Sequence, residues 1–108
     1  MSTVIYSESI KNASTIAPSE VYRMPIPKSS KDYYRTFNAC DIFLRGATDV
    51  EISFDLDPKR TIQSIGRGGG IIVEKSDGYD FQELFIKNIG TTVTIAVDEV
   101  LVIIKKVL

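Results

Sequence analysis

The stretch VEISFD, residues 50–55, decides the fold class, because its apolar residues alternate strictly with polar ones. Successive side chains of a β-strand point to opposite faces, so Val50, Ile52 and Phe54 are expected to share one face. An amphipathic helix would instead repeat its apolar residues every three or four positions. The stretch therefore predicts a strand with one buried and one exposed face.

Similar runs, rich in β-branched residues and bounded by turn residues, recur along the chain. β-Branched residues favour strands over helices, and Gly, Pro, Asn and Asp mark the reversals between strands. Short strands at such regular spacing are typical of a sandwich or barrel. The further strands are expected at residues 4–10, 21–26, 36–44, 61–65, 71–74, 84–87, 92–97 and 100–107.

These strands predict an all-β fold: a single β-sandwich or jelly-roll-like domain of about eight or nine short antiparallel strands. The 108 residues have the length of one domain, and the 44% hydrophobic content is enough for a core. Residues 10–30 are rich in Ser and Pro and weakly patterned. They are expected to form a surface connection or, alternatively, an extended docking arm.

The composition removes several classes of function. The chain has no histidine and one cysteine, Cys40, which excludes Ser-His-Asp and Cys-His nucleophile systems, ordinary zinc sites and an intrachain disulfide. Cys40 lies in an apolar run and is expected to be a small buried residue. The 13 basic and 14 acidic residues leave no basic excess, so nucleic acid is not an expected partner.

The N-terminal residues show no basic region followed by an apolar core, so no signal peptide is expected. The longest apolar run, residues 100–104, is too short to span a bilayer, and no membrane partner is expected. We therefore expect synthesis in a cytoplasm. The glycosylation sequon at Asn12 is interpreted as a chance match, because it lacks a secretory context.

The glycine-rich stretch IGRGGGI, residues 65–71, is the most conspicuous local feature. A phosphate-binding loop needs a helix after its glycines, and a P-loop also needs Lys-Ser or Lys-Thr. Here residues 71–74 have the pattern of a strand. A turn or bulge between two strands is therefore favoured over a nucleotide site, with Arg67 exposed at its tip as a candidate partner contact.

Carboxylates are paired at Asp55 and Asp57, and again at Asp77 and Asp80. Loops of a β-sandwich can gather such groups around Ca²⁺, which binds several oxygen ligands. Alternatively, Asp side chains cap turns by accepting backbone N–H groups. Neither pair has the spacing of an EF-hand, so turn capping is the prediction and no metal or other cofactor is expected.

The run DYYR, residues 32–35, has two interpretations. Tyr and Arg are enriched at interface hot spots, so the run could be a recognition surface. It could equally begin a strand, with one Tyr pointing inward and one outward. Tyr79 is a second aromatic site in an expected loop. The candidate partner contacts are Tyr33, Tyr34, Arg35, Arg67 and Tyr79.

The segment 97–108 is the most apolar part of the chain. Alternation breaks down over residues 100–104, which indicates a strand that is covered on both faces. Such a strand is either central in its sheet or covered on one face by a neighbouring subunit. An uncovered strand of this kind would be prone to aggregation, so the segment also suggests a homo-oligomer.

From residue 47 onward, four runs follow one another in a characteristic order. The runs are TDVEISFD (48–55), IIVE (71–74) after a glycine-rich turn, FQELFIKN (81–88) and GTTVTIAV (90–97). This layout resembles that of small virion β-sandwich proteins of tailed bacteriophages and related viruses. The sequence departs from their pattern at LDPKR (56–60), where a glycine-rich hairpin is usual. The resemblance implies a decoration, spike, fibre or tail component, and it carries over no functional residues.

The resemblance and the composition lead to one main hypothesis, a non-enzymatic structural protein of the virion. Its expected partners are other virion proteins and further copies of itself, in a trimer or another ring. A second hypothesis is a carbohydrate- or small-ligand-binding module that uses exposed tyrosines. A third is an enzyme with a carboxylate or lysine mechanism, for which no constellation of residues is found.

Overall fold

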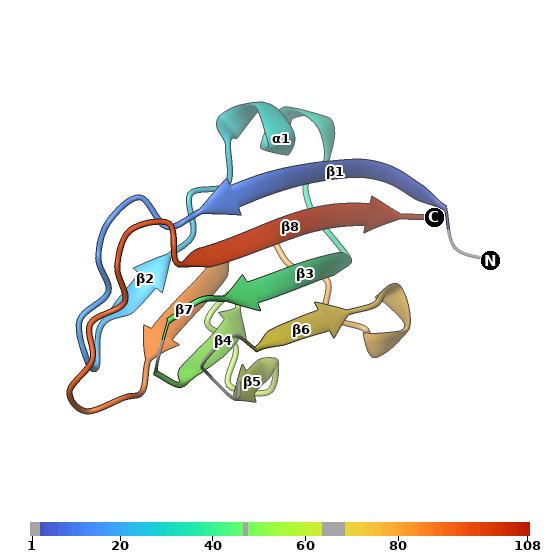
Figure 1. Ribbon diagram of the computed structural model, residues 1–108. Helices are drawn as coiled ribbons and strands as arrows, with labels where there is room; N and C mark the ends of the chain where they lie inside the picture. The colour runs from blue at the N-terminus through green and yellow to red at the C-terminus, as the bar shows by residue number, and fades with distance from the viewer. Residues whose placement is uncertain (1–2, 47, 64–68) are drawn as a thin grey trace.

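The computed structural model describes residues 3–46, 48–63 and 69–108, and strands make up most of it (Figure 1). One short α-helix and one 3-10 turn interrupt the strands. Among the described residues the elements are β1 (Val4–Lys11), β2 (Val21–Arg23), α1 (Lys28–Tyr33), β3 (Ala39–Leu44), β4 (Val50–Phe54), β5 (Thr61–Gln63), β6 (Gly70–Val73), η1 (Lys75–Asp77), β7 (Leu84–Asn88) and β8 (Val100–Val107).

The eight strands form two four-stranded antiparallel sheets, with the orders β1-β8-β3-β6 and β2-β7-β4-β5. The pairs β1·β8, β2·β7, β3·β6 and β4·β5 are nested along the chain, as in one long hairpin. Alternate pairs of this hairpin lie in opposite sheets. This is the strand order of a jelly roll, so the predicted all-β sandwich or jelly-roll-like domain is confirmed.

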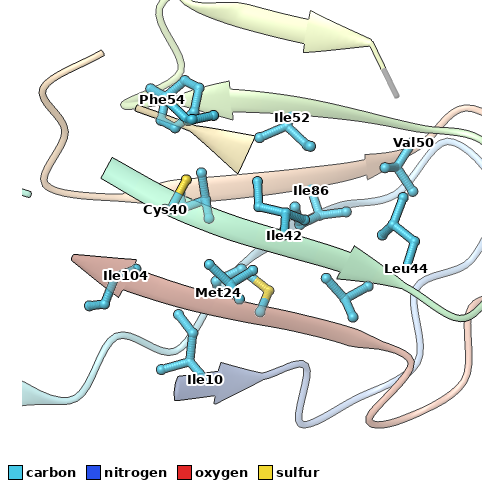
Figure 2. Close-up of a cluster of buried hydrophobic side chains, with 14 of the residues drawn as sticks. Ile10, Met24, Cys40, Ile42, Leu44, Val50, Ile52, Phe54, Ile86 and Ile104 are labelled. Atoms are coloured by element: carbon cyan, nitrogen blue, oxygen red, sulfur yellow. The ribbon is translucent and has the colours of Figure 1, made fainter. Parts of the chain in front are cut away.

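The core lies between the two sheets. The alternation predicted for residues 50–55 is confirmed, because Val50, Ile52 and Phe54 are all fully buried. Figure 2 shows side chains from both sheets, such as Ile42 and Ile86, meeting in the space between them. Cys40 is also buried there, as predicted.

β8 is a central strand, with β1 on one side and β3 on the other. Its inward-facing residues, among them Val102 and Ile104, are fully buried in the core. Leu101 and Ile103 alternate with them and are half-buried on the outer face of the sheet. The structure therefore shows the central position in the sheet that one of the two explanations for the apolar C-terminal segment requires.

The strand predicted at residues 92–97 is wrong. This segment is a loop with one isolated bridge, between Ile95 and Ile16. The side chain of Asn88 donates to the carbonyl of Val93 at 2.8 Å and so withdraws that carbonyl from strand pairing. Asp98 has a positive φ of 66°, which reverses the chain just before β8. Residues 92–97 therefore have the alternating pattern of a strand but, among the described residues, no neighbouring strand to pair with.

The region 10–30 is packed against the rest of the molecule. Ile16 is fully buried and exchanges two 2.9 Å backbone hydrogen bonds with Ile95. Pro25 follows β2 closely and ends its ladder, because proline has no N–H to donate. Pro27 then precedes α1, which ends at Tyr33. Of the two interpretations of residues 32–35, the start of a strand is thus wrong for Tyr33.

Three buried asparagines, Asn12, Asn38 and Asn88, link distant parts of the chain. Asn12 donates to the carbonyls of Ser14 and Ala96 and accepts the N–H of Val100 at 2.9 Å. The Asn12 side chain, which belongs to the sequon, is thus fully buried and hydrogen-bonded in the folded chain. Asn38 bonds both the N–H and the carbonyl of Val107 at 2.8 Å, as a neighbouring strand would.

Candidate protein-protein interface

The outer face of the sheet β1-β8-β3-β6 carries a cluster of apolar side chains, here called the apolar patch. The register places Phe43 opposite both Leu101 and Gly70, and Asp41 opposite both Ile103 and Ile72. The patch consists of Phe43, Ile72, Leu101 and Ile103, which are therefore direct or diagonal neighbours across three strands. Phe43 is 43% exposed and Ile72 is 67% exposed.

An ion pair lies within this face. Lys105 Nζ is 2.6 Å from Asp41 Oδ2, and both side chains are largely shielded from solvent. Beside Phe43 the surface forms an open hollow, whose lining includes Arg45, Gly70 and Leu101. The charges of Asp41 and Lys105 neutralise each other, so the side of this face that β3 and β6 form offers a partner mainly apolar contact.

The outer face of the opposite sheet differs in chemistry. There Lys87 lies between Val21 and Glu51 in the register, and Phe85 lies between Arg23 and Ser53. Charged and hydroxyl side chains thus separate the two apolar ones on this face. Since an exposed apolar cluster marks an interaction surface more strongly than isolated apolar residues do, the apolar patch is the better candidate interface.

The sequence-predicted contact residues do not form one surface. Tyr33 is 73% exposed on α1, and its ring centroid is 5.8 Å from that of Tyr6. Tyr34 is half-buried, and its ring centroid is 5.6 Å from that of the same Tyr6. Arg35 is exposed next to them. Figure 1 places α1 beside β1, away from the β3 and β6 strands of the apolar patch.

The other two predicted contacts have different outcomes. Tyr79 is half-buried, and its ring stacks on Phe54 with centroids 5.0 Å apart and planes inclined by 19°. Its ring is therefore used mainly in packing. Arg67 lies outside the described residues. The prediction that a strand follows the glycine-rich stretch is confirmed, because β6 begins at Gly70.

The carboxylates of the β4–β5 loop serve as structural acceptors. Asp55 Oδ1 accepts the backbone N–H groups of Gln82 and Glu83, at 2.9 and 2.7 Å. Its Oδ2 atom lies 3.1 Å from Nη2 of Arg60, which also donates to the carbonyl of Asp80. These contacts fasten the loop to the segment before β7.

Asp57 and Asp77 cap turns, as the turn-capping interpretation requires. Asp57 accepts the N–H of Lys59 at 2.9 Å, and this bond, together with Arg60, holds the pKa of Asp57 below its usual 3.8. Asp77 accepts the N–H of Glu74 at 2.8 Å. Within the ranges that the structure describes, no group of three or more Cys, Asp or Glu side chains is placed to hold a metal ion.

Cys40 is placed where a thiolate is disfavoured. Burial, reinforced by the nearby Asp41 carboxylate, raises the pKa of the Cys40 thiol to about 12. Since the thiolate is the nucleophilic form of cysteine, Cys40 has the character of a packing residue. No helix in the described part of the chain is long and apolar enough to cross a membrane.

Comparisons of the chain with protein-family models, with curated proteins and with solved structures found no match. The surface of the molecule is therefore the main guide to its function. Sequence reasoning did not identify the apolar patch, because Phe43, Ile72 and Leu101 are far apart in the chain. The sequence contains only a partial signal. Residues 71–73 are all apolar, so each of them could have belonged to the core, and the pattern does not reveal that Ile72 points outward.

Proposed function

We propose that this chain is a non-enzymatic structural protein that works by protein–protein contact as a component of a virus particle, such as a decoration, spike or tail protein. The observation that carries the proposal is the apolar patch on one outer sheet face. A contiguous exposed apolar cluster is unfavourable in water unless another surface covers it.

Two further observations support this proposal. The jelly-roll strand order is used by capsid domains, although it is also used by lectins and cupins, so the fold supports the virion role without requiring it. Three of the groups that could carry chemistry in the described chain have structural uses. Asp55 and Asp57 hold turns, and Cys40 is buried with a raised pKa.

Particle association tests the proposal directly. Virus particles produced by the host that carries the gene would be separated on a density gradient and probed with an antibody against the chain. We expect the chain to migrate with the particles, and Phe43→Ser to reduce its share in that band. Phe85→Ser is the matched control, because Phe85 is half-buried on the polar outer face of the opposite sheet.

The proposal fails if the wild-type chain stays entirely at the top of the gradient while the particles form normally. It is also contradicted if Phe43→Ser and Phe85→Ser reduce the particle-bound share equally, because the two outer faces would then be equivalent. Folding of both variants is checked by circular dichroism before the comparison.

One observation favours a second candidate, a carbohydrate-binding module. The highly exposed ring of Tyr33 lies on α1, and a hollow close by in sequence is lined by Lys31, Arg35 and Gln82. Exposed aromatic rings with polar neighbours are suited to stack on sugars. A glycan array probed with wild type and Tyr33→Ala tests this candidate. Binding that Tyr33→Ala abolishes would support it, and an array without signal in Ca²⁺ and in EDTA would remove it.

A further inference from the structure

The four sheet edges of the molecule differ in how they are protected. β1 has an irregular register between Val4 and Tyr6 and carries the exposed charge of Lys11. β2 has three residues and ends at Arg23, and β5 also has three residues. Bulges, charges and shortness are the usual means of preventing edge pairing. β6 (Gly70–Val73) contains neither a charge nor a proline, and its Ile72 side chain is the one that is 67% exposed.

The hydrogen-bond register shows which groups of β6 are open. Leu44 N–H donates to the carbonyl of Gly69 at 2.9 Å, so the backbone groups of Gly69, and by alternation those of Ile71, face β3. The N–H and C=O groups of Gly70 and Ile72 face away from β3. Among the described residues, no hydrogen bond to these outward groups is found.

We propose that two copies of the chain pair through β6, antiparallel, about a twofold axis at Ile71. Gly70 of each copy then lies opposite Ile72 of the other, and the two sheets join into one continuous sheet. All the outward backbone groups of Gly70 and Ile72 are used, in four reciprocal hydrogen bonds. An antiparallel pair of identical strands has a twofold axis by construction, so this contact is isologous and closes as a dimer.

The register follows from the groups that are available. An axis at Ile72 would place Gly70 opposite Glu74 of the second copy, but the Glu74 N–H already donates to Asp77 Oδ2 at 2.8 Å. An axis between two residues would place an outward-facing residue opposite one whose backbone faces β3. Only an axis at Ile71 gives the outward N–H and C=O groups of both Gly70 and Ile72 hydrogen-bond partners among the residues that the structure describes.

The side chains fit this register as well. Gly70 has no side chain, so the Ile72 side chain of the second copy can lie over it. Phe43 covers the other side of Gly70, because a Cβ atom added there would be 3.4 Å from Phe43 Cδ1. Ile72 would therefore contact the Phe43 ring of the second copy and bury the two most exposed members of the apolar patch. Directly opposite residues share a face of the sheet, as this contact requires.

The inference deepens the proposed function and rests on it in one respect, because a protein that works by contact needs a surface that fits its partner. The partner of the β6 edge is a second copy of the chain. The sequence analysis expected a trimer or another ring, whereas the β6 edge supports a twofold pair. A ring would need an additional contact elsewhere on the molecule.

Sedimentation equilibrium of the full chain tests the dimer. We expect wild type to show a reversible monomer–dimer equilibrium, and Ile72→Lys to weaken the dimer by at least about tenfold, since it places a charge against Phe43 and Gly70. Ile72 is mostly exposed, so the substitution leaves the monomer folded. Val21→Lys is the matched control, an exposed aliphatic residue on the β2 edge of the other sheet, and it should leave the equilibrium unchanged.

Cysteine cross-linking tests the register. Directly opposite, non-hydrogen-bonded residues have Cα atoms about 4.5 Å apart, within the range of a disulfide. Ile71→Cys should therefore give a covalent dimer on mild oxidation. Ile72→Cys should not, because in this register the two copies of residue 72 are diagonal neighbours, about 7–8 Å apart. Wild type, with Cys40 buried, is the control.

Each outcome decides a separate question. A wild-type monomer at all concentrations, or a dimer that Ile72→Lys does not weaken, would overturn the inference. A covalent dimer from Ile72→Cys but not from Ile71→Cys would overturn its register. A monomer that still migrates with particles would overturn the dimer and leave the proposed function standing. A dimer that is absent from particles would overturn the proposed function and leave the dimer standing.

Discussion

At the scale of single residues, the buried asparagine side chains form hydrogen bonds with backbone N–H and C=O groups that strand pairing leaves without a partner. The amide of Asn88 donates to the carbonyls of Ile16 and Val93, at 3.0 and 2.8 Å, and accepts the N–H of Gly90. It thereby joins the two long loops that cover one end of the sandwich. A hydrogen-bonding group left buried without its partner is unfavourable, so each such amide is a sensitive point in the fold.

Replacing Asn88 by Ala is therefore expected to lower the free energy of unfolding by about 3 kcal/mol, because two carbonyls, one N–H and the Thr48 hydroxyl lose their partner. Urea denaturation followed by circular dichroism measures the change. Gln82→Ala is the control. Gln82 is exposed, so its side-chain amide can form its hydrogen bonds with water, and the substitution should change stability by less than about 0.5 kcal/mol. Equal effects in the two variants would contradict the bridging role.

Cys40 provides a prediction about pH. The folded state raises the pKa of this thiol from 9.0 to about 12, so the unfolded chain releases the proton first as pH rises. The stabilising contribution of the neutral thiol is fully present below pH 9 and is lost as pH rises from 9 toward 12. Cys40→Ala removes this titration.

The stability advantage of wild type over Cys40→Ala should therefore shrink between pH 9 and pH 10.5, by at most about 1.4 kcal/mol per pH unit. Chemical denaturation at several pH values measures it. At pH 8 the native thiol should also resist Ellman's reagent and react only after unfolding. Rapid modification of the folded protein at pH 8 would show that Cys40 is accessible.

At the scale of elements, the β4–β5 connection is tight but strained. Asp57 N–H donates to the carbonyl of Phe54 at 3.1 Å, and the two residues between them, Asp55 and Leu56, have positive φ values of 56° and 58°. This is the pattern of a type I′ turn, which favours Asn-Gly. Leu56 thus occupies a position suited to glycine while its side chain is 58% exposed.

Leu56→Gly is expected to raise the free energy of unfolding by about 1 kcal/mol, because glycine adopts a positive φ without steric conflict. Thermal or urea denaturation measures the gain. Leu56→Ala is the matched control: it removes most of the same apolar surface but keeps the Cβ atom, so it should bring no gain. A stabilising effect of both variants would show that the exposed side chain, and not the backbone conformation, is unfavourable.

The strands were predictable where local pattern and long-range pairing agree. The alternating run of residues 50–55 and the apolar run of β8 both coincide with strands of the core. Residues 92–97 alternate equally well, yet the chain there is bonded by the Asn88 side chain and has no ladder. Local sequence cannot reveal which segment finds a partner, because that depends on residues far away in the chain.

The candidate interface was less predictable than the fold. Among the aromatic and charged residues that the sequence suggested as contacts, Tyr79 is half-buried and stacks on the core residue Phe54. The apolar patch depends on the register that sets Phe43 opposite Gly70 and Asp41 opposite Ile72. Such a register is a property of the folded sheet. What the sequence did indicate was a strongly apolar β8, whose Leu101 and Ile103 contribute to the patch.

At the scale of the whole molecule, the nested strand pairing determines how many residues separate the two strands of each pair. β4 and β5 are joined by a short loop, whereas β1 and β8 bring together the first and last strands of the chain. Leu108 N–H donates to the carbonyl of Thr3 at 2.9 Å, so the first and last described residues lie side by side. Closing a longer loop loses more chain entropy, which favours early formation of the inner pair.

Two matched substitutions test this folding order. Ile52 in β4 and Ile104 in β8 are both fully buried, and Ile→Val at either position should lower stability by about 1 kcal/mol. If the inner pair forms first, Ile52→Val should mainly slow folding and Ile104→Val should mainly speed unfolding. Stopped-flow chevron plots in urea separate the two rates. The reverse assignment, with Ile104→Val slowing folding and Ile52→Val leaving it unchanged, would mean that the sandwich is organised from its ends inward.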